Sequence, residues 1–244
     1  MIATLATLIL VQVGDTWDIQ FTEPFQLERP VGWMVLDPDT HGAETISEMK
    51  SKGIRTICYV SVGSVEDWRT DLAAFPDAVI GKPLGDWPGE RYLDIRALDV
   101  LVPIMEARFR ECQAAGYDGV SPDNMDVFEA DSGFPLTEAD GVAYVRALTD
   151  IAHGMDMSIG QKNVPQLSAQ LVEFMDWIQV EGCFEWDFCG DLSPYTLAGK
   201  PIFAIEYTDS GIDFAAACAE AKARGISMIL KNRELSGAVY DTCQ

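Results

Sequence analysis

Two carboxylates in this sequence stand where acid–base chemistry could use them. Asp123 ends the short run GVSPD, and Glu181 stands next to the end of the apolar run WIQVEG. Hydrolysis of a glycosidic bond requires such a pair, because one carboxylic acid protonates the leaving oxygen while a second carboxylate attacks the anomeric carbon or activates water. We therefore predict that Asp123 and Glu181 form the catalytic pair of a sugar-cleaving site.

Further polar and aromatic side chains stand at the ends of similar apolar runs and could surround a substrate. We predict that the following residues bind it: Gln20, Asp37, Tyr59, Asn124, Asp126, Lys162, Asn163, Glu206, Tyr207 and Lys231. Glu206 is also the reserve catalytic acid. For the two lysines, an ion pair with neighbouring carboxylates is preferred to a Schiff base with the substrate.

Several of these residues also have a purely structural interpretation. Asp123 follows a proline and could serve only in a turn, while Glu181 could serve only as an ion-pair partner of Lys162. Asp126 could cap the turn that follows it. Two tryptophans outside these runs, Trp68 and Trp87, are either core residues or platforms for sugar rings.

Other chemistries lack the residues that they need. The histidines, His41 and His153, do not end any apolar run, which disfavours a Ser-His-Asp hydrolase. Neither a G-x-G-x-x-G nor a G-x-x-x-x-G-K motif occurs, so dinucleotide and P-loop chemistry have no support. No C-x-x-C pair is present, which argues against a structural zinc ion. We therefore expect neither a metal ion nor a cofactor.

Eight short apolar runs have the length and composition of strands buried on both faces of a parallel sheet. They span residues 16–22, 31–37, 54–62, 119–123, 158–163, 177–182, 201–207 and 227–232. Helical segments at 43–52, 98–115, 137–153, 164–174 and 211–224 lie between most of them, and several end at a glycine. Thr137 and Asp140 match a capping box, and residues 184–200 have room for one helical turn.

This alternation predicts a (β/α)8 TIM barrel, an α/β fold, formed by residues 14–244 as one catalytic domain. Residues 23–30 are too few for a full helix, so the first β/α unit lacks one. Residues 64–97 form the longest loop. Active sites of such barrels lie at the carboxyl ends of the strands, so the candidate residues would meet at one mouth. Asp123 and Glu181 would stand there two strands apart.

The charge balance restricts the partners of this protein. The chain has 39 acidic and 17 basic residues and a formal net charge of −22. Such a surface repels phosphate backbones, so we expect no nucleic-acid partner. The charge suits a cationic partner, although a saline habitat or solubility alone would also explain it. No apolar run reaches the ~18 residues that span a bilayer, so we expect no membrane insertion.

Six cysteines allow three disulfides in 15 pairings, although six buried thiols would also suit a core. We predict the pairs Cys58–Cys112, Cys183–Cys189 and Cys218–Cys243. The first joins the third strand to the helix that returns over it, the second brackets a short loop, and the third ties the C-terminus to the last long helix.

The first residues, MIATLATLILV, are similar to the apolar part of a signal peptide but lack a basic region before it. We interpret residues 1–13 as either a signal-peptide remnant or an N-terminal extension. Together with the predicted disulfides, this segment favours a secreted or periplasmic protein.

The segments at the strand ends, taken together, resemble glycoside hydrolase family 114, the endo-α-1,4-polygalactosaminidases. The matching segments are TWDIQFT, ICYVSVGSVEDWR, WPGERYLDIR, GYDGVSPDNMD, SGFPLT, GQKN, VEGCFE and AGKPIFAIEY. They follow the family's order over nearly the whole chain from Thr16 on. The resemblance implies a (β/α)8 barrel that cuts α-1,4-linked galactosamine polymers, with Asp123 as nucleophile and Glu181 as its partner. This chain departs from the family at Ser121, where a glutamate usually precedes Pro-Asp-Asn.

We therefore predict a secreted, monomeric, metal-independent glycoside hydrolase that cleaves within a cationic, galactosamine-rich polysaccharide and retains the anomeric configuration. A first alternative is a non-catalytic carbohydrate-binding barrel in which Ser121 marks the loss of the site. A second is a metal-dependent phosphodiester hydrolase that uses the acidic residues with Mg²⁺ or Ca²⁺.

Overall fold

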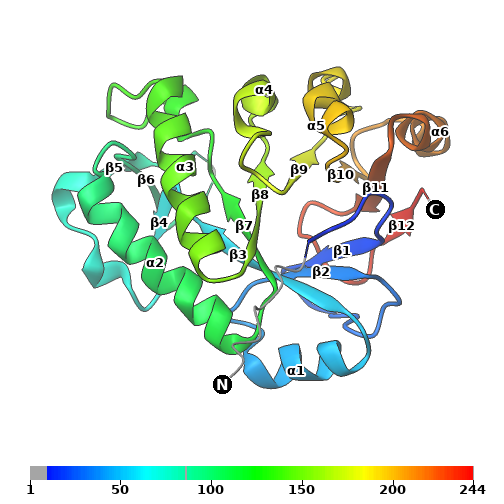
Figure 1. The fold of residues 1–244 in the computed structure, drawn as a ribbon, viewed down its shortest axis with the longest axis horizontal. Coiled ribbons are helices and arrows are strands. Elements are labelled where there is room, and N and C mark those ends of the chain that lie inside the picture. Colours follow the sequence, from blue (N-terminus) through cyan, green and yellow to red (C-terminus); the bar gives the residue numbers. More distant parts are fainter. Residues whose placement is uncertain (1–9, 86, 244) are drawn as a thin grey trace, which may run out of the picture.

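A curled sheet of nine strands forms the centre of the structure (Figure 1). The structure is a computed structural model that describes residues 10–85 and 87–243. Eight strands pair in parallel, each with the next: β1 (Trp17–Gln20), β2 (Trp33–Leu36), β3 (Arg55–Ser61), β7 (Gly119–Asp123), β8 (Ser158–Lys162), β9 (Trp177–Glu181), β10 (Ile202–Tyr207) and β11 (Ile226–Lys231). A short ninth strand, β12 (Asp241–Thr242), is antiparallel to β11. The parallel strands coincide with the eight predicted runs, and the TIM-barrel fold class is confirmed.

The first and last parallel strands of this sheet, β1 and β11, lie side by side. The Trp17 indole donates a hydrogen bond to the Ser227 carbonyl at 2.8 Å. Just beyond the strands, the Phe21 amide donates to the Leu235 carbonyl at 2.9 Å. In the described part of the chain, individual contacts of this kind, rather than a strand ladder, close the barrel.

Helices connect the strands, and most lie where the sequence predicts them. They are α1 (Ala43–Ser51), α2 (Leu98–Ala115), α3 (Glu138–Gly154), α4 (Ser168–Leu171), α5 (Ser193–Ala198) and α6 (Phe214–Arg224). Thr137 caps α3 in the predicted capping box with Asp140. Residues 21–32 are all described and contain no helix, so the first unit lacks one as expected. Residues 184–200 hold more than one turn, because η5 (Cys189–Leu192) precedes α5.

The helix predicted over residues 164–174 is wrong in extent. The chain forms a 3-10 turn, η4 (Pro165–Leu167), and only then the four-residue α4. Val164 has a φ of 47°, which β-branched residues rarely adopt. The Gln161 side-chain amide donates to the carbonyls of Asn163 and Val164 at 2.8 and 3.0 Å. These bonds hold a tight turn where the pattern predicts a continuous helix.

Residues 64–97 do not form the plain loop that we expected, because they contain a second sheet. Its antiparallel strands, in the order β4-β6-β5, are β4 (Ser64–Glu66), β5 (Ile80–Pro83) and β6 (Glu90–Leu93). The 3-10 turns η1 (Leu72–Ala74) and η2 (Asp77–Val79) lie between β4 and β5, and a further one, η3 (Val127–Glu129), follows β7. Strands of three or four residues are too short to show alternation in a sequence. The second sheet forms one side of the molecule in Figure 1.

Side chains on each barrel strand alternate between the interior and the helix layer, because successive residues of a strand point to opposite faces. The interior is filled by Trp17, Ile19, Trp33, Val35, Ile57, Trp177, Phe203, Ile205, Tyr207 and Ile229. Gly160 is required within it, since a Cβ there would lie 2.5 Å from the Trp177 ring. At the carboxyl ends of the strands, the inward-facing positions are occupied by Asp37, Tyr59, Asp123, Lys162 and Glu181.

All three predicted disulfides are present. The Cα atoms are 6.0, 4.8 and 5.0 Å apart in Cys58–Cys112, Cys183–Cys189 and Cys218–Cys243. These distances lie within the ~7 Å that a disulfide permits. No cysteine among the described residues remains free.

The predicted leader remnant over residues 1–13 lies mostly outside the described residues, which begin at Leu10. Val11 is buried and packs with the barrel interior.

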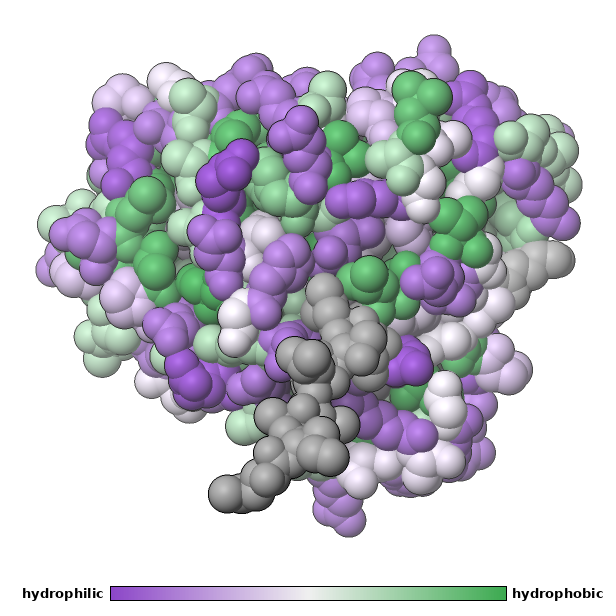
Figure 2. Space-filling model, in the orientation of Figure 1, coloured by the Kyte–Doolittle hydropathy of each residue, from purple (hydrophilic) through white to green (hydrophobic). Residues whose placement is uncertain are grey.

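Hydrophilic and hydrophobic residues are interspersed over the face shown in Figure 2. Within residues 10–85 and 87–243, no helix combines the length and the apolar character that crossing a lipid bilayer would require.

We expect loss of Cys58–Cys112 to destabilise the protein more than loss of Cys183–Cys189. The sequence separations are 54 and 6, and a longer closed loop removes more entropy from the unfolded chain. Replacing both cysteines with alanine should lower the free energy of unfolding by about 4 kcal/mol for the first pair and about 2 kcal/mol for the second. Urea denaturation of the two double variants measures these losses, and equal losses would contradict the prediction.

Candidate active site

A cavity of about 570 Å³ opens at the carboxyl ends of the barrel strands. Nine of the predicted site residues line it: Asp37, Tyr59, Asp123, Asn124, Asp126, Lys162, Asn163, Glu181 and Tyr207. Concave sites of this size with converging polar groups are typical of small-molecule and substrate binding.

Lys162 joins the two predicted catalytic carboxylates at the centre of this cavity. Its ammonium nitrogen lies 3.0 Å from Asp123 Oδ1 and 2.5 Å from Glu181 Oε2. Lys162 is only 7% exposed, and a buried charge is costly unless it is paired. The ion pair that we considered as a structural alternative for Glu181 is therefore present. The same ion pair holds Glu181 close to Asp123.

The surroundings of Glu181 keep this residue ionised. Burial raises the pKa of its carboxyl, but the Lys162 ammonium and hydrogen bonds from Tyr207 and Asn163 outweigh burial and lower the pKa to about 2. The Tyr207 hydroxyl donates to Oε1, and the Asn163 side-chain amide donates to Oε2 at 3.1 Å. Burial lowers the pKa of Lys162, but the two carboxylates raise it above its ordinary value. At neutral pH the resting site therefore contains a carboxylate at Glu181 and an ammonium at Lys162.

Asp123 has a second partner, and the residue that follows it has an unusual backbone conformation. The Tyr59 hydroxyl donates to Asp123 Oδ2 at 3.2 Å. Burial and the nearby carboxylates raise the pKa of Tyr59, so its phenol stays protonated and able to donate. Asn124 has a φ of 59°, which asparagine tolerates better than most residues. Its side chain donates to the hydroxyls of Ser61 and Ser64 at 2.9 and 3.2 Å, which ties the end of β7 to the second sheet.

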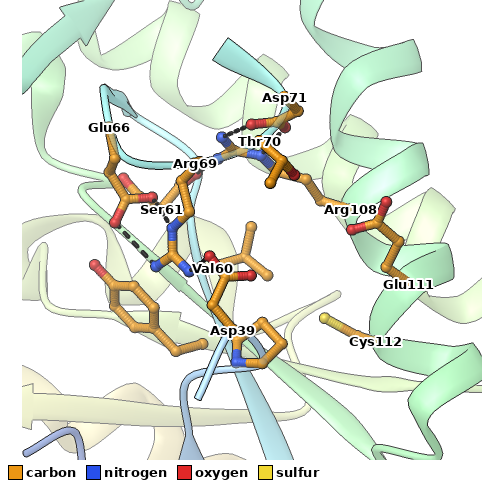
Figure 3. Close-up of a pocket in the computed structure, with 12 residues that line it drawn as sticks. Asp39, Val60, Ser61, Glu66, Arg69, Thr70, Asp71, Arg108, Glu111 and Cys112 are labelled. Atoms are coloured by element: carbon orange, nitrogen blue, oxygen red, sulfur yellow. Dashed lines mark hydrogen bonds and ion pairs between the residues drawn. The ribbon is translucent and has the colours of Figure 1, made fainter. Parts of the chain in front are cut away.

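Arg69 organises an acidic wall beside this centre. Its guanidinium contacts Asp37 at 2.7 Å and both Asp39 and Glu66 at 2.8 Å. Figure 3 shows Arg69 with Glu66 and Asp39 on this wall, next to a smaller cavity of about 40 Å³. Burial raises the pKa of Glu66, and Arg69 opposes that shift. Asp37 therefore lines the main cavity as the partner of an arginine.

Gln20 and Lys231 are predicted substrate-binding residues that do not line this cavity. Both are fully buried. The Gln20 side-chain amide donates to Asp18 Oδ2 at 2.7 Å, and Lys231 Nζ lies 2.8 Å from Asp18 Oδ1. Lys231 thus has the ion-pair partner that we preferred for it. The contact lies at the barrel seam rather than at the mouth.

Glu206 does not line the cavity either. Its neighbours Ile205 and Tyr207 belong to the barrel interior, so Glu206 points the other way. Its carboxylate accepts hydrogen bonds from the backbone amides of Phe184 at 2.8 Å and Glu185 at 3.3 Å. Burial raises the pKa of Glu206, although these bonds oppose the shift. In the structure this side chain supports the loop after β9.

Sequence reasoning missed several residues that line the cavity. They are Glu66, Arg69, Glu90, Trp186 and Arg233. The first three lie on or beside the second sheet, which we interpreted as a loop. Trp186 and Arg233 follow the ends of β9 and β11, and their positions on βα loops were the signal that could have identified them.

Trp68 and Trp87 line the same cavity and are 52% and 63% exposed. This exposure decides against the core interpretation that the sequence left open.

Within the described residues, no group of three or more His, Cys, Asp or Glu side chains is arranged to hold a metal ion.

A family model described as glycoside hydrolase family GH114 matches residues 3–244. This chain belongs to family GH114. Its structure is similar to that of Ega3 from Aspergillus fumigatus in complex with galactosamine, with a TM-score of 0.89, 32% sequence identity and coverage of 98% of both chains. The chain is therefore a glycoside hydrolase, and the resemblance seen in the sequence is confirmed.

Two further proteins are similar to this GH114 enzyme, one in structure and one in sequence. The glycoside hydrolase domain of PelA from Pseudomonas aeruginosa aligns with a TM-score of 0.72 and 17% identity over 93% of this chain and 98% of that one. An uncharacterized protein of Deinococcus radiodurans is 26% identical over 247 residues, which cover 90% of this chain and 77% of that protein.

We expect the pKa of Glu181 to rise when Lys162 is replaced. In Lys162→Gln the attractive positive charge is lost while burial remains, so the carboxyl should titrate well above the value of about 2 that it has beside the lysine. Carbon-13 NMR titration of labelled glutamate side chains measures this pKa. Lys82→Gln is the control, because exposed Lys82 pairs with Asp131 outside the cavity. A Glu181 pKa that stays low in Lys162→Gln would contradict the role assigned to the ammonium.

Proposed function

We propose that this GH114 enzyme cleaves internal α-1,4 bonds in a galactosamine-rich, cationic polysaccharide. The observation that carries the proposal is the pair Asp123 and Glu181, held by one lysine inside an acidic cavity. The galactosamine in the structure of Ega3, at 32% identity, supports an amino-sugar ligand. Carboxylates that line the cavity, among them Glu90 and Asp126, would attract the ammonium groups of such a polymer.

In the proposed mechanism Asp123 is the nucleophile and Glu181 is the acid. Asp123 attacks the anomeric carbon while Glu181 protonates the leaving oxygen, and a covalent glycosyl-enzyme forms. Glu181 then removes a proton from a water molecule that attacks the anomeric carbon and releases Asp123. Tyr59 keeps Asp123 oriented through its hydrogen bond to Oδ2. The net reaction adds one water across the glycosidic bond.

The short distance between the two carboxylates supports retention of configuration. One ammonium contacts both, at 3.0 and 2.5 Å. The two contacting oxygens therefore lie no further apart than the sum of these distances, about 5.5 Å, whereas inverting enzymes hold their carboxyl groups ~6.5–9.5 Å apart and retaining ones ~5–5.5 Å.

The acid role requires Glu181 to take up a proton that it lacks in the resting site. A sugar placed between the carboxylates would exclude water and weaken the contact between Glu181 and Lys162. Both changes favour the neutral carboxylic acid. Substrate binding would therefore raise the pKa of Glu181 toward the range that general acid catalysis needs.

We also propose that the enzyme works outside the cytoplasm. All six cysteines are paired in disulfides, and such bonds persist in oxidising compartments and are rare in the cytosol. Secretion or a periplasmic location agrees with a polymeric substrate, which is too large to enter a cell freely.

We expect Asp123→Asn and Glu181→Gln each to lower kcat by roughly 10²–10⁴-fold, because each change keeps the side-chain volume and removes a proton-transfer or nucleophilic group. Reducing-end release and mass spectrometry of products from galactosaminogalactan, chitosan and α-galactan measure the activity and the bond specificity. The control is Glu173→Gln, which removes an exposed carboxyl outside the cavity. Near-full activity of Glu181→Gln together with loss of activity in Glu206→Gln would move the acid role to Glu206.

We expect salt to weaken the binding of a deacetylated polymer and full N-acetylation to slow cleavage. The chain carries a net charge of −22, and attraction of a polycation weakens as the Debye length falls from ~10 Å at 0.1 M to ~3 Å at 1 M. Cleavage of deacetylated and fully acetylated polymer at low and high NaCl measures both effects. Equal rates on the two polymers, unaffected by salt, would refute the cationic substrate and leave the glycosidase activity in place. Activity that rises with salt would point instead to a surface adapted to saline conditions.

A further inference from the structure

The loop after β9 presents a large aromatic ring at the wall of the catalytic cavity. Trp186 lines the cavity and is 70% exposed. The loop does have access to the core, because Phe184 and Phe188, on either side of Trp186, pack against the core cluster. The exposure of Trp186 is therefore not a consequence of a loop that lies away from the core. The loop thus packs two partly buried phenylalanines against the core and leaves its tryptophan at the cavity.

A disulfide fixes the base of this loop. Cys183 and Cys189 are bonded and both are buried. Within the loop, the Trp186 amide donates to the Gly182 carbonyl and the Phe188 amide donates to the Cys183 carbonyl, each at 2.9 Å. Residues 182–189 therefore form a compact turn whose two ends cannot separate. We call this segment the Trp186 loop.

Two charged side chains hold the Trp186 loop against the barrel. Glu206, fully buried on β10, accepts the backbone amides of Phe184 and Glu185. Arg233, beyond β11, contacts Glu185 Oε2 at 3.0 Å and stacks with its guanidinium 4.0 Å from the centre of the Tyr207 ring. The Tyr207 hydroxyl in turn donates to Glu181. Arg233 and Tyr207 therefore connect the Trp186 loop to the catalytic carboxylate.

Gly182 brings the indole close to the catalytic centre. This residue directly follows Glu181 and has a φ of +68°, a conformation that suits glycine. A Cβ at this position would lie 2.9 Å from Trp186 Cδ1. The absence of a side chain at Gly182 is therefore what allows the ring to pack beside the backbone of the catalytic strand.

We propose that Trp186 is a sugar-stacking platform for a unit next to the scissile bond, and that the Trp186 loop is its rigid mount. The proposal rests on the proposed function. The C–H face of a pyranose is apolar and matches the flat ring of the indole. A ring fixed before binding loses little conformational entropy when the sugar arrives, so it contributes more to affinity than a mobile one.

Trp68 and Trp87 provide aromatic rings on the other side of the cavity. They belong to the segment that follows β3, whereas Trp186 follows β9, and these two strands are three positions apart in the eight-stranded order. A polymer that passes over Asp123 and Glu181 would thus meet aromatic rings on both sides of the scissile bond. This arrangement is the one expected for cleavage within a chain.

The decisive experiment compares Trp186→Ala with wild type on a galactosamine hexasaccharide. We expect KM to rise roughly tenfold with kcat within about twofold, because a stacking contact made equally in the ground and transition states affects binding alone. Trp186→Tyr should keep most of the affinity. Leu197→Ala is the matched control, since Leu197 is an 87% exposed apolar residue outside the cavity. The double variant Cys183→Ser/Cys189→Ser should raise KM in the same direction with an unchanged far-ultraviolet circular dichroism spectrum.

The outcomes separate this inference from the proposed function. Wild-type cleavage of the hexasaccharide together with a KM of Trp186→Ala equal to that of Leu197→Ala would overturn the platform and leave the enzyme's function intact. An unchanged KM in the double cysteine variant would overturn the rigid mount. If wild type cleaves no galactosamine polymer, the proposed function fails. Calorimetric titration of wild type with the hexasaccharide then tests the platform by itself. Absence of binding overturns the platform, and binding that weakens in Trp186→Ala supports it.

Discussion

Lys162 places one positive charge between two carboxylates that would otherwise repel each other at close range. Its ammonium is almost fully buried and contacts Asp123 and Glu181 directly. Removing one partner would leave an unpaired buried charge, so each of the three groups depends on the other two. The hydroxyls of Tyr59 and Tyr207 complete the set, one on each carboxylate. The resting site is therefore held together by the contact that, in the proposed mechanism, the substrate loosens so that Glu181 can act as an acid.

This ionic centre lies where it does because of two simple features of the barrel. Parallel strands bring their carboxyl ends to one edge, and alternation along each strand sends every second side chain inward. Packed rings such as Trp177 fill the interior below the mouth. The polar side chains that end the inward-facing rows can therefore lie only at the mouth. The second sheet and the Trp186 loop then add walls around that mouth. The helices support the barrel from outside.

The apolar runs were sufficient to predict all eight parallel strands and the meeting of Asp123, Lys162 and Glu181 at one mouth, because both follow from patterns local to each strand. The same alternation would have placed the Glu206 side chain outside the cavity, since its neighbours Ile205 and Tyr207 belong to the interior. Lys231 shows the limit of this reasoning. It follows inward-facing Ile229 by two residues, yet it pairs with Asp18 at the seam, and a contact between the first and last strands cannot be read from either strand alone. The second sheet was missed because its strands have only three or four residues.

Ser121 shows how a departure from the family pattern can leave the ion pairs of the site in place. It lies two residues before Asp123 on the same inward row, is buried, and donates to Gln179 Oε1 at 3.4 Å. A glutamate in its place, as the family resemblance leads one to expect, would add a third anion near Lys162 and raise the pKa values of the carboxyls around it. Ser121 and Gln179 are both uncharged, so in the described part of the chain Lys162 has two anionic partners, Asp123 and Glu181. A serine at this position therefore changes the charge of the cavity floor, while Asp123, Glu181 and Lys162 keep their contacts with one another.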